Sequence, residues 1–344
     1  MYGGLYPNKD FFVIYSELIK KKMKRIFAIF LSSTMFIFFA TLHANAQKYK
    51  FEKAQKLTIG NASEESYPLA SPDGKTLYFT RFFDPDNTGG KRAGSDIWTS
   101  ILDPTGVWQT PSLLKKPLNN KKNNFAIGFS EDGNCLFLLN TYRSTSRTDI
   151  AFYNLKFNDQ RPQPFDVPKI KNGGGFFGLY VHPSEKIILV SVAGDDSYGQ
   201  EDLYVILKDT ADNWLPMQNL GPMINTSGFE ISPFLSDDGA TLFFSSDGHG
   251  GYGDADIFMA ERLYGTWNVW SRPVNLGPNI NSEGFDAYFS LSKDKKAFFA
   301  SNKDGGFSDI YMAEQILEAD STTLRIQKLI EDAKKLLNAS DGVN

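Results

Sequence analysis

Three carboxylates and one amide recur at one position of a repeated sequence pattern, and these residue types could do chemistry. Each stands six residues before the start of a turn, and an aromatic residue takes the position in one copy; the positions are Glu65, Asn124, Phe176, Glu230 and Asp286. Two carboxyl groups roughly 5–10 Å apart can serve as acid and as base or nucleophile on a glycosidic bond. Carboxylates grouped with an amide can instead bind a cation, or each can bond the neighbouring backbone. The elements that carry them therefore decide their role.

The chain repeats one unit five times. "NLGPMINTSGFE" begins at Asn219 and "NLGPNINSEGFD" begins at Asn275, and eight of these twelve residues are identical. An aspartate followed by an apolar residue marks each unit at intervals of 53 or 54 residues; these are Asp96, Asp149, Asp202, Asp256 and Asp309. Function normally breaks such regularity while packing repeats it. We therefore expect these aspartates to bond loop N–H groups and to fix a turn.

Each unit predicts four short strands. Phe, Tyr, Ile, Val and Thr dominate the runs, and Gly, Pro, Asp and Asn separate them without helical periodicity. A repeat of this length with four strands is typical of a propeller blade, so residues 47–314 predict an all-β, five-bladed β-propeller. The alternative is a six-bladed ring, which needs one more unit than the sequence contains. The strand near residues 51–59 matches a blade-ending segment, so we expect it to complete the fifth blade.

Both ends of the chain differ from the repeats. "KKKMKR", the apolar stretch "IFAIFLSSTMFIFFATL" and "HANAQ" follow one another. This layout predicts that residues 1–46 are an export signal cleaved after Ala46, with Met23 as the expected start. A membrane anchor is the alternative. Residues 315–344 predict an amphipathic C-terminal helix with Ile326 and Ile330 on one face, which packs on the ring or binds a partner.

Composition limits the partners and the chemistry. The net charge is −4, and residues 1–46 carry an excess of positive charge, so the exported part is acidic and unsuited to nucleic acid. The one cysteine, Cys135, excludes a disulfide framework. Gln47 rather than a cysteine follows the cleavage site, so we expect a periplasmic or secreted protein without a lipid anchor or a membrane span. After residue 46 only His182 and His249 remain, too few for a histidine-rich zinc site, and no G-x-S-x-G motif indicates a serine hydrolase.

The repeat also carries a family pattern. "E-x-x-P/S-x-x-S-x-DG-x-x-L-x-F-x-S" is followed by "GG-x-G-x-x-DI" and "W-x-x-P-x-NLG-x-x-IN", over residues 48–314 and best in 230–281. This pattern resembles the WD40-like repeat of TolB-type β-propellers, and most of all those exported by Gram-negative bacteria and often fused to an OmpA-like peptidoglycan-binding domain. Asn124, Phe176 and "HPSE" at His182 depart from it. The resemblance implies a periplasmic or surface binding scaffold and names no catalytic residue.

One face of the predicted ring gathers the candidate binding residues. The innermost strand of each blade begins at the acidic position, and the loops after the second and fourth strands reach the same face. Variable loops on a rigid scaffold commonly bind ligands, and aromatic residues with mixed charge suit sugars or peptides. The candidate ligand-binding residues are Glu65, Asn124, Glu230, Asp286, Tyr142, Arg143, Tyr198, His249 and Tyr252. The alternative is that the loop residues are solvated and have no role.

These features favour a non-enzymatic binding or protein-interaction scaffold in the cell envelope. Its expected partner is an envelope protein, polysaccharide or peptidoglycan, and no cofactor or metal is assigned, although a divalent cation between the axial carboxylates stays open. The alternative is a propeller glycoside hydrolase or lyase with Glu65, Glu230 and Asp286 as the catalytic carboxylates. Against this alternative, the three share one motif position, whereas an acid and a base generally occupy different environments.

The export signal gives a prediction that mass spectrometry can check. The mass of the native protein should be that of a chain that begins at Gln47, and the protein should be recovered in the soluble fraction, because a signal peptidase removes the apolar stretch. A membrane-bound species that retains residues 30–39 would identify that stretch as an anchor instead.

Overall fold

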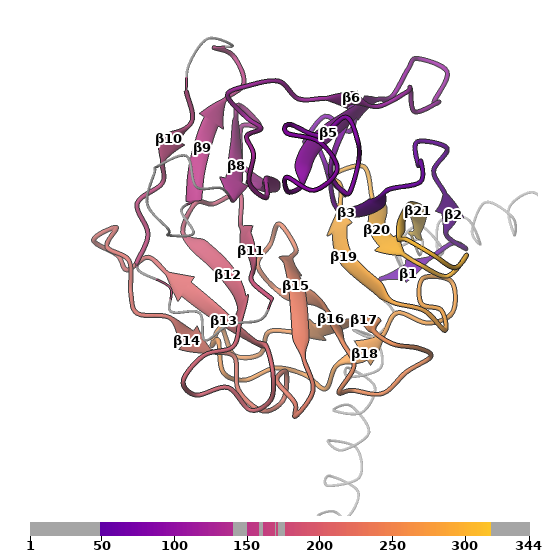
Figure 1. Ribbon diagram of the computed structural model, residues 1–344. Coiled ribbons are helices and arrows are strands. Elements are labelled where there is room, and N and C mark those ends of the chain that lie inside the picture. The colour runs from indigo at the N-terminus through magenta and orange to yellow at the C-terminus, as the bar shows by residue number, and fades with distance from the viewer. Residues whose placement is uncertain (1–48, 140–149, 158–160, 169, 171–175, 318–344) are drawn as a thin grey trace, which may run out of the picture. The chain divides into compact units, whose positions relative to one another are not determined.

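The computed structural model describes residues 49–139, 150–157, 161–168, 170 and 176–317, and this part of the chain forms a ring of β-sheets without a helix (Figure 1). The predicted export signal and Asp149 lie outside the described residues, as does the predicted C-terminal helix from residue 318 onward. Within the described ranges no helix is long and apolar enough to cross a bilayer. The all-β, five-bladed propeller expected from the sequence is confirmed.

Four blades are antiparallel sheets of four consecutive strands. Blade 1 contains β3 (Glu64–Ala70), β4 (Thr76–Phe82), β5 (Asp96–Ile101) and β6 (Ser112–Leu113). Blade 2 contains β7 (Phe125–Phe129), β8 (Cys135–Leu139), β9 (Ile150–Asn154) and β10 (Gln163–Pro164). Blade 3 contains β11 (Gly178–Val181), β12 (Ile187–Val192), β13 (Asp202–Leu207) and β14 (Gln218–Asn219). Blade 4 contains β15 (Glu230–Leu235), β16 (Thr241–Ser246), β17 (Asp256–Glu261) and β18 (Val274–Asn275).

The fifth blade joins the two ends of the ring. It contains β19 (Asp286–Leu291), β20 (Lys296–Ser301) and β21 (Asp309–Ile316), and β1 (Lys50–Phe51) and β2 (Gln55–Lys56) both pair with β21. This pairing confirms the predicted closure and leaves no open seam between the first and last blades. β21 also continues to Ile316, two residues into the segment that the sequence assigned to the C-terminal helix.

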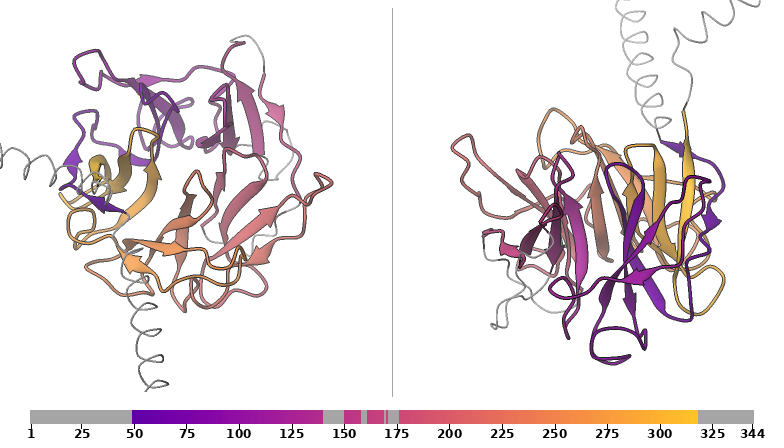
Figure 2. Two further views of the ribbon diagram at one scale, coloured as in Figure 1. Left: turned by 180° about the vertical axis from the view of Figure 1, so that it is seen from behind. Right: turned by 90° about the horizontal axis from the view of Figure 1, so that it is seen from above.

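The core lies between the faces of neighbouring blades. Leu77 and Phe79 of blade 1 pack in one cluster with Phe298 and Ile310 of blade 5, and all four are at most 1% exposed. Similar clusters join the other neighbouring blades. Figure 2 shows the ring of blades from behind and from above. Truncating one such aromatic ring to alanine costs about 3–5 kcal/mol. The repeated apolar runs therefore hold the blades at fixed positions around the axis.

A repeated asparagine fixes the segment that leaves a blade. Asn281 accepts a hydrogen bond from the N–H of Ile257 at 2.8 Å and donates one to its carbonyl at 2.9 Å. Asn119 and Asn225 form the same pair of bonds with Ile97 and Leu203. Each amide thus satisfies two backbone groups that would otherwise be buried without partners. This explains why "IN" closes the "NLG" segment of the repeat.

The closure predicts how the ring responds to truncation. Removing residues 49–60 takes away β1 and β2 and exposes the outer edge of β21, so the whole ring should lose several kcal/mol in one cooperative transition. We expect the melting temperature to fall by at least about 10 °C, at roughly 2–4 °C per kcal/mol for a domain of this size. A chain that lacks residues 318–344 is the control, since every described strand remains in it. An unchanged melting temperature after removal of 49–60 would refute closure by these strands.

Candidate functional site

The carboxylates at the start of the innermost strands are buried clamps. Glu230 is 0% exposed and accepts hydrogen bonds from the N–H and hydroxyl of Thr226, both at 2.7 Å, and from the hydroxyl of Ser246. Asp286 accepts the same two bonds from Ser282. Asn124 accepts one from the N–H of Asn120 at 2.7 Å. In each case the partner N–H lies four residues earlier, in the loop that enters the blade.

Glu65 departs from this arrangement. Arg81 pairs with Glu65 across the strands as Ser246 pairs with Glu230 in blade 4. Its Nε donates to Glu65 at 3.0 Å, and one of its terminal nitrogens donates to the Ile59 carbonyl. Burial raises the pKa of Glu65 to about 7 although the guanidinium opposes this. Its Oε2 accepts no hydrogen bond within the described part of the chain. Burial also raises the pKa values of Glu230 and Asp286.

From the sequence we expected these side chains to gather on the axis as a ligand site, and the structure places them elsewhere. Glu65, Asn124, Glu230 and Asp286 are all 0% exposed, and none of them lines the axial cavity. The physical reason is that Asn124, Glu230 and Asp286 turn onto their own loops, and Glu65 onto Arg81, rather than toward the axis. As folded, the four have no surface on which a ligand could bind. No group of three or more possible metal-ligating side chains occurs among the described residues.

The other candidates fall into two groups. The repeated aspartates lie where loops turn into third strands. Asp202 and Asp256 accept hydrogen bonds from the N–H groups of Tyr198 and Tyr252, and Asp96 accepts one from the N–H of Thr88. Asp309 forms an ion pair with Lys56. The rings of Tyr198 and Tyr252 are about half exposed on those loops. His249 donates to the Ile224 carbonyl at 2.7 Å and lies against Phe244 and Phe258. Tyr142 and Arg143 lie outside the described residues.

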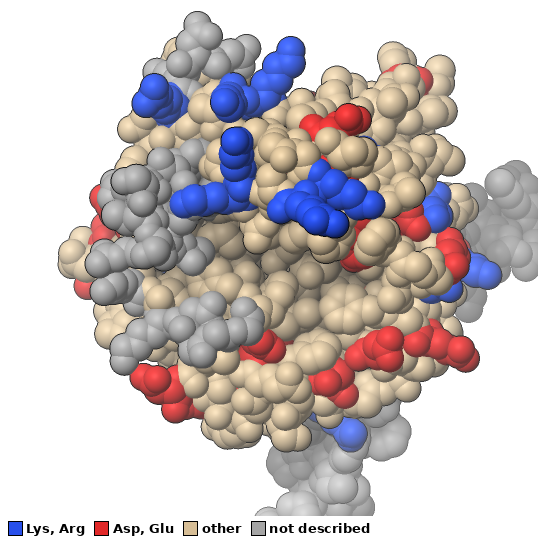
Figure 3. Space-filling view, viewed as in Figure 1, with Lys and Arg blue, Asp and Glu red and all other residues tan. Residues whose placement is uncertain are grey.

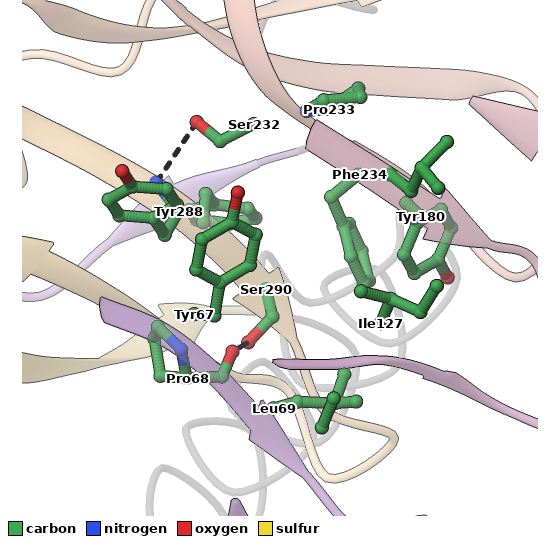
Figure 4. Close-up of a pocket in the computed structure, with 13 residues that line it drawn as sticks. Tyr67, Pro68, Leu69, Ile127, Tyr180, Ser232, Pro233, Phe234, Tyr288 and Ser290 are labelled. Carbon is green, nitrogen blue, oxygen red and sulfur yellow. Dashed lines mark hydrogen bonds between the residues drawn. The ribbon is translucent and has the colours of Figure 1, made fainter. Parts of the chain in front are cut away.

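Bulges in the innermost strands build a cavity on the axis. The pairing of β3, β15 and β19 with their neighbours shifts at Tyr67, Ser232 and Tyr288, which have φ values of 50°, 47° and 60°. Positive φ is uncommon for such residues and often accompanies function. These residues line a small cavity that is open to solvent, together with Leu69, Ile127, Tyr180 and Phe234 (Figure 4). The N–H of Tyr288 donates to the Ser232 hydroxyl at 3.1 Å and links two blades at the axis.

An aromatic track leads from this cavity to the surface. The ring centroids of Tyr67 and Tyr288 are 4.4 Å apart, and each ring lies near further aromatic rings. The successive ring pairs are Phe176–Tyr288 at 6.3 Å, Tyr67–Phe125 at 4.7 Å, Phe82–Phe125 at 5.8 Å, Phe82–Phe83 at 6.3 Å and Phe83–Phe307 at 5.7 Å. Phe83 and Phe307 are stacked although 48% and 46% exposed. Exposed, ordered aromatic faces of this kind mark binding surfaces.

Two half-buried carboxylates flank the track. Glu64 accepts the N–H of Ser308 at 3.0 Å, and its charge adds to burial in raising the pKa of the Tyr288 hydroxyl. Glu201 accepts the N–H of Phe176 at 2.8 Å, and the Phe176 ring is 6.3 Å from that of Tyr288. In both cases one oxygen is fixed by backbone, and the second accepts no hydrogen bond from the residues that the structure describes. The pair thus combines a fixed orientation with an accessible oxygen.

Sequence reasoning missed this site because it followed the motif positions that recur from unit to unit. Tyr67, Ser232 and Tyr288 stand two residues after Glu65, Glu230 and Asp286, and their types vary from blade to blade. The signal that could have found them is this variation at a position next to a constant one, since binding breaks the symmetry of a repeat. The positive φ angles that aim them at the axis have no signature in an isolated strand sequence.

Comparisons with known proteins support the fold. No family model and no curated protein matches the chain. A solved structure described as "Glycoside hydrolase" is 11% identical, covers 82% of this chain and 97% of that one, and has a TM-score of 0.52. The catalytic domain of the Coprinopsis cinerea GH62 alpha-L-arabinofuranosidase is 9% identical, covers 78% and 98%, and has a TM-score of 0.53. TolB from Acinetobacter baumannii is 14% identical, covers 73% and 55%, and has a TM-score of 0.41.

These likenesses change two expectations. The expectation that the chain is not an enzyme is contradicted, because structures that share its ring over most of both chains are glycoside hydrolases. The β-propeller implied by the resemblance to TolB-type repeats is supported. The likeness to TolB itself is too weak to carry that family label or the link to OmpA-like domains. At these low identities the comparisons establish the fold alone.

The buried Glu65 predicts a pH dependence of stability. Its pKa rises from 4.5 in the unfolded chain to about 7 in the folded ring, so the folded state holds the proton more tightly. Stability from this group is therefore present below pH 4.5 and falls as the pH rises toward 7, by about 3 kcal/mol in all. Urea unfolding at pH 5 and pH 7.5 should show a smaller loss for Glu65→Gln than for wild type.

The matched control is Glu201→Gln, which removes a half-buried carboxylate with no role in the closure. It should lose as much stability between the two pH values as wild type does. Equal losses in wild type and Glu65→Gln would show that Glu65 is ionised throughout this range and that Arg81 outweighs burial.

Proposed function

We propose that this chain is a glycoside hydrolase that binds its substrate along the aromatic track at the axis. The observation that carries the proposal is the track itself, because Glu64 and Glu201 bond the backbone at its two ends, at Ser308 next to Phe307 and at Phe176. Aromatic rings offer flat apolar faces to sugar rings, and their hydroxyl edges offer hydrogen bonds. The glycoside hydrolases among the structures that share this ring support the same class of activity. Arabinose-containing polysaccharides are the first substrates to test, because one of those structures is an alpha-L-arabinofuranosidase.

The chemistry requires two carboxyl groups in different protonation states. In hydrolysis one carboxylic acid protonates the leaving oxygen, and the other carboxylate activates water or attacks the anomeric carbon. Glu64 and Glu201 lie in different surroundings, since Glu64 accepts the N–H of Ser308 and Glu201 that of Phe176. The proposal replaces Glu65, Glu230 and Asp286 as the catalytic set, because a fully buried carboxylate cannot reach a sugar.

The carboxylate pair gives the first test of the activity. Glu64→Gln and Glu201→Gln should each lower the release of reducing sugar at least about 100-fold, the typical contribution of a general acid or base. Binding of the oligosaccharide should persist in both, because the aromatic track is intact. Glu131→Gln is the control, since it removes an exposed carboxylate from a turn between β7 and β8. Full activity in both variants would refute the assignment of the pair.

The aromatic track gives a second, independent test. Tyr288→Ala removes a ring that contacts Tyr67 and lies near Phe176, so oligosaccharide binding measured by calorimetry should weaken at least about tenfold. Tyr264→Ala is the matched control, because Tyr264 is 82% exposed and lies in the loop from β17 to β18 of blade 4, whereas Tyr288 lies in β19 of blade 5. Unchanged affinity in Tyr288→Ala would place the sugar elsewhere on the ring.

A further inference from the structure

The face that carries the aromatic track is divided by charge. Figure 3 shows Lys and Arg side chains gathered over the first two blades on one side of the central hollow, and Asp and Glu side chains gathered over the fourth and fifth blades on the other. On the first side, the loop from β4 to β5 and the loop from β6 to β7 contribute four exposed cations, which are Lys91, Arg92, Lys121 and Lys122. We call these four residues the basic rim. The exposed acids of the corresponding loops on the other side are Asp247, Asp254, Glu283 and Asp304.

The two loops of the basic rim are held against each other. The N–H of Ser95 donates to the Asn123 side chain at 3.1 Å, and the N–H of Asn124 donates to the Ser95 carbonyl at 2.9 Å. Gly94 approaches the Lys122 carbonyl so closely that a Cβ would lie 2.7 Å from it. The four cations are therefore displayed on a fixed support rather than on independent loops.

The same loops begin and end at the aromatic track. Lys91 and Arg92 follow Phe82 and Phe83 in the loop from β4 to β5, while Lys121 and Lys122 precede Phe125. The ring centroids of Phe82 and Phe125 are 5.8 Å apart, so the two loops start from one point of the track. A sugar chain that lies on these rings therefore lies at the base of the two loops that carry the basic rim.

The cations of the basic rim have no anionic partner of their own. None of the four forms an ion pair within the described part of the chain, although the protein is acidic overall. Four like charges on two packed loops repel one another, and a bound anion relieves that repulsion. The acidic side of the hollow would repel the same anion, so the division also orients it.

We infer that the substrate of this site is an anionic polysaccharide, with carboxylate or sulfate groups that meet the basic rim while its sugar rings lie on the aromatic track. The inference rests on the proposed function and narrows it to a class of substrate. Polysaccharides with uronate groups and those with sulfate groups both carry anions that can pair with the basic rim, and the experiment below distinguishes them. A neutral glycan would satisfy the track and leave the cations unpaired.

The experiment compares charged and neutral ligands on the full chain. Calorimetry or affinity electrophoresis would measure binding of polygalacturonate, dextran sulfate, neutral arabinan and double-stranded DNA at low and high salt. The test variant is Lys91→Gln/Arg92→Gln/Lys121→Gln/Lys122→Gln. The matched control is Lys75→Gln/Lys186→Gln/Lys293→Gln/Lys295→Gln, which removes four exposed cations from the turns between first and second strands.

We expect wild type to bind one of the two anionic polysaccharides at least about tenfold more tightly than arabinan, and the test variant to lose that preference. Exposed ionic contacts are individually weak and screened by salt, so four together give roughly this factor, reduced at high salt. The control variant should bind all ligands as wild type does. Whichever of polygalacturonate and dextran sulfate binds more tightly identifies the anionic group.

Three outcomes would overturn the inference. Equal affinity for arabinan and both anionic polymers would refute it while leaving the proposed hydrolase intact. DNA that binds as tightly as the best polysaccharide would show attraction to any polyanion rather than recognition of a sugar. Failure of wild type to bind any of the polysaccharides would remove the proposed function as well.

Discussion

The backbone N–H groups of the loops that cross from blade to blade must be satisfied where the ring buries them, and in three blades one side chain at the start of the innermost strand does this. Glu230, Asp286 and Asn124 each accept the N–H four residues earlier. A buried N–H left without a partner costs roughly 1–3 kcal/mol, which favours an acceptor at this position in these three blades. In blade 1 Glu65 instead accepts from Arg81, which also donates to the carbonyl of Ile59 in the loop that enters the blade.

This use of the carboxylates determines where a ligand can bind. Because the repeated acids face their own loops, the axial cavity is lined by the residues that follow them, and these residues differ between blades. Tyr67 and Tyr288 come together there, while Ser232 bonds the backbone of Tyr288. The constant position therefore builds the ring, and the variable position beside it builds the site.

Much of the fold could be predicted from the sequence, because strand and turn residues recur at a constant interval. The five blades and the closure by β1 and β2 follow from counting units and from the missing last strand. The site could not be predicted in the same way. Whether Glu230 faces the axis or its loop depends on a bulge two residues later, and a bulge moves a side chain to the other face without a change in composition. Glu64 and Glu201 become neighbours of one track only through the circular arrangement of blades 1, 3 and 5.

The central claim is that the buried acids hold the ring and the aromatic track holds the sugar. A crystal structure of the Glu64→Gln variant with a bound oligosaccharide tests it most directly, because the variant should bind without cleaving. The account predicts sugar rings stacked on Tyr67 and Tyr288 and within hydrogen-bond reach of Glu201, with Glu230 and Asp286 still bonded to their loops and Glu65 to Arg81. A sugar bound on the opposite face, or directly to Glu230 after its clamp has opened, would contradict it.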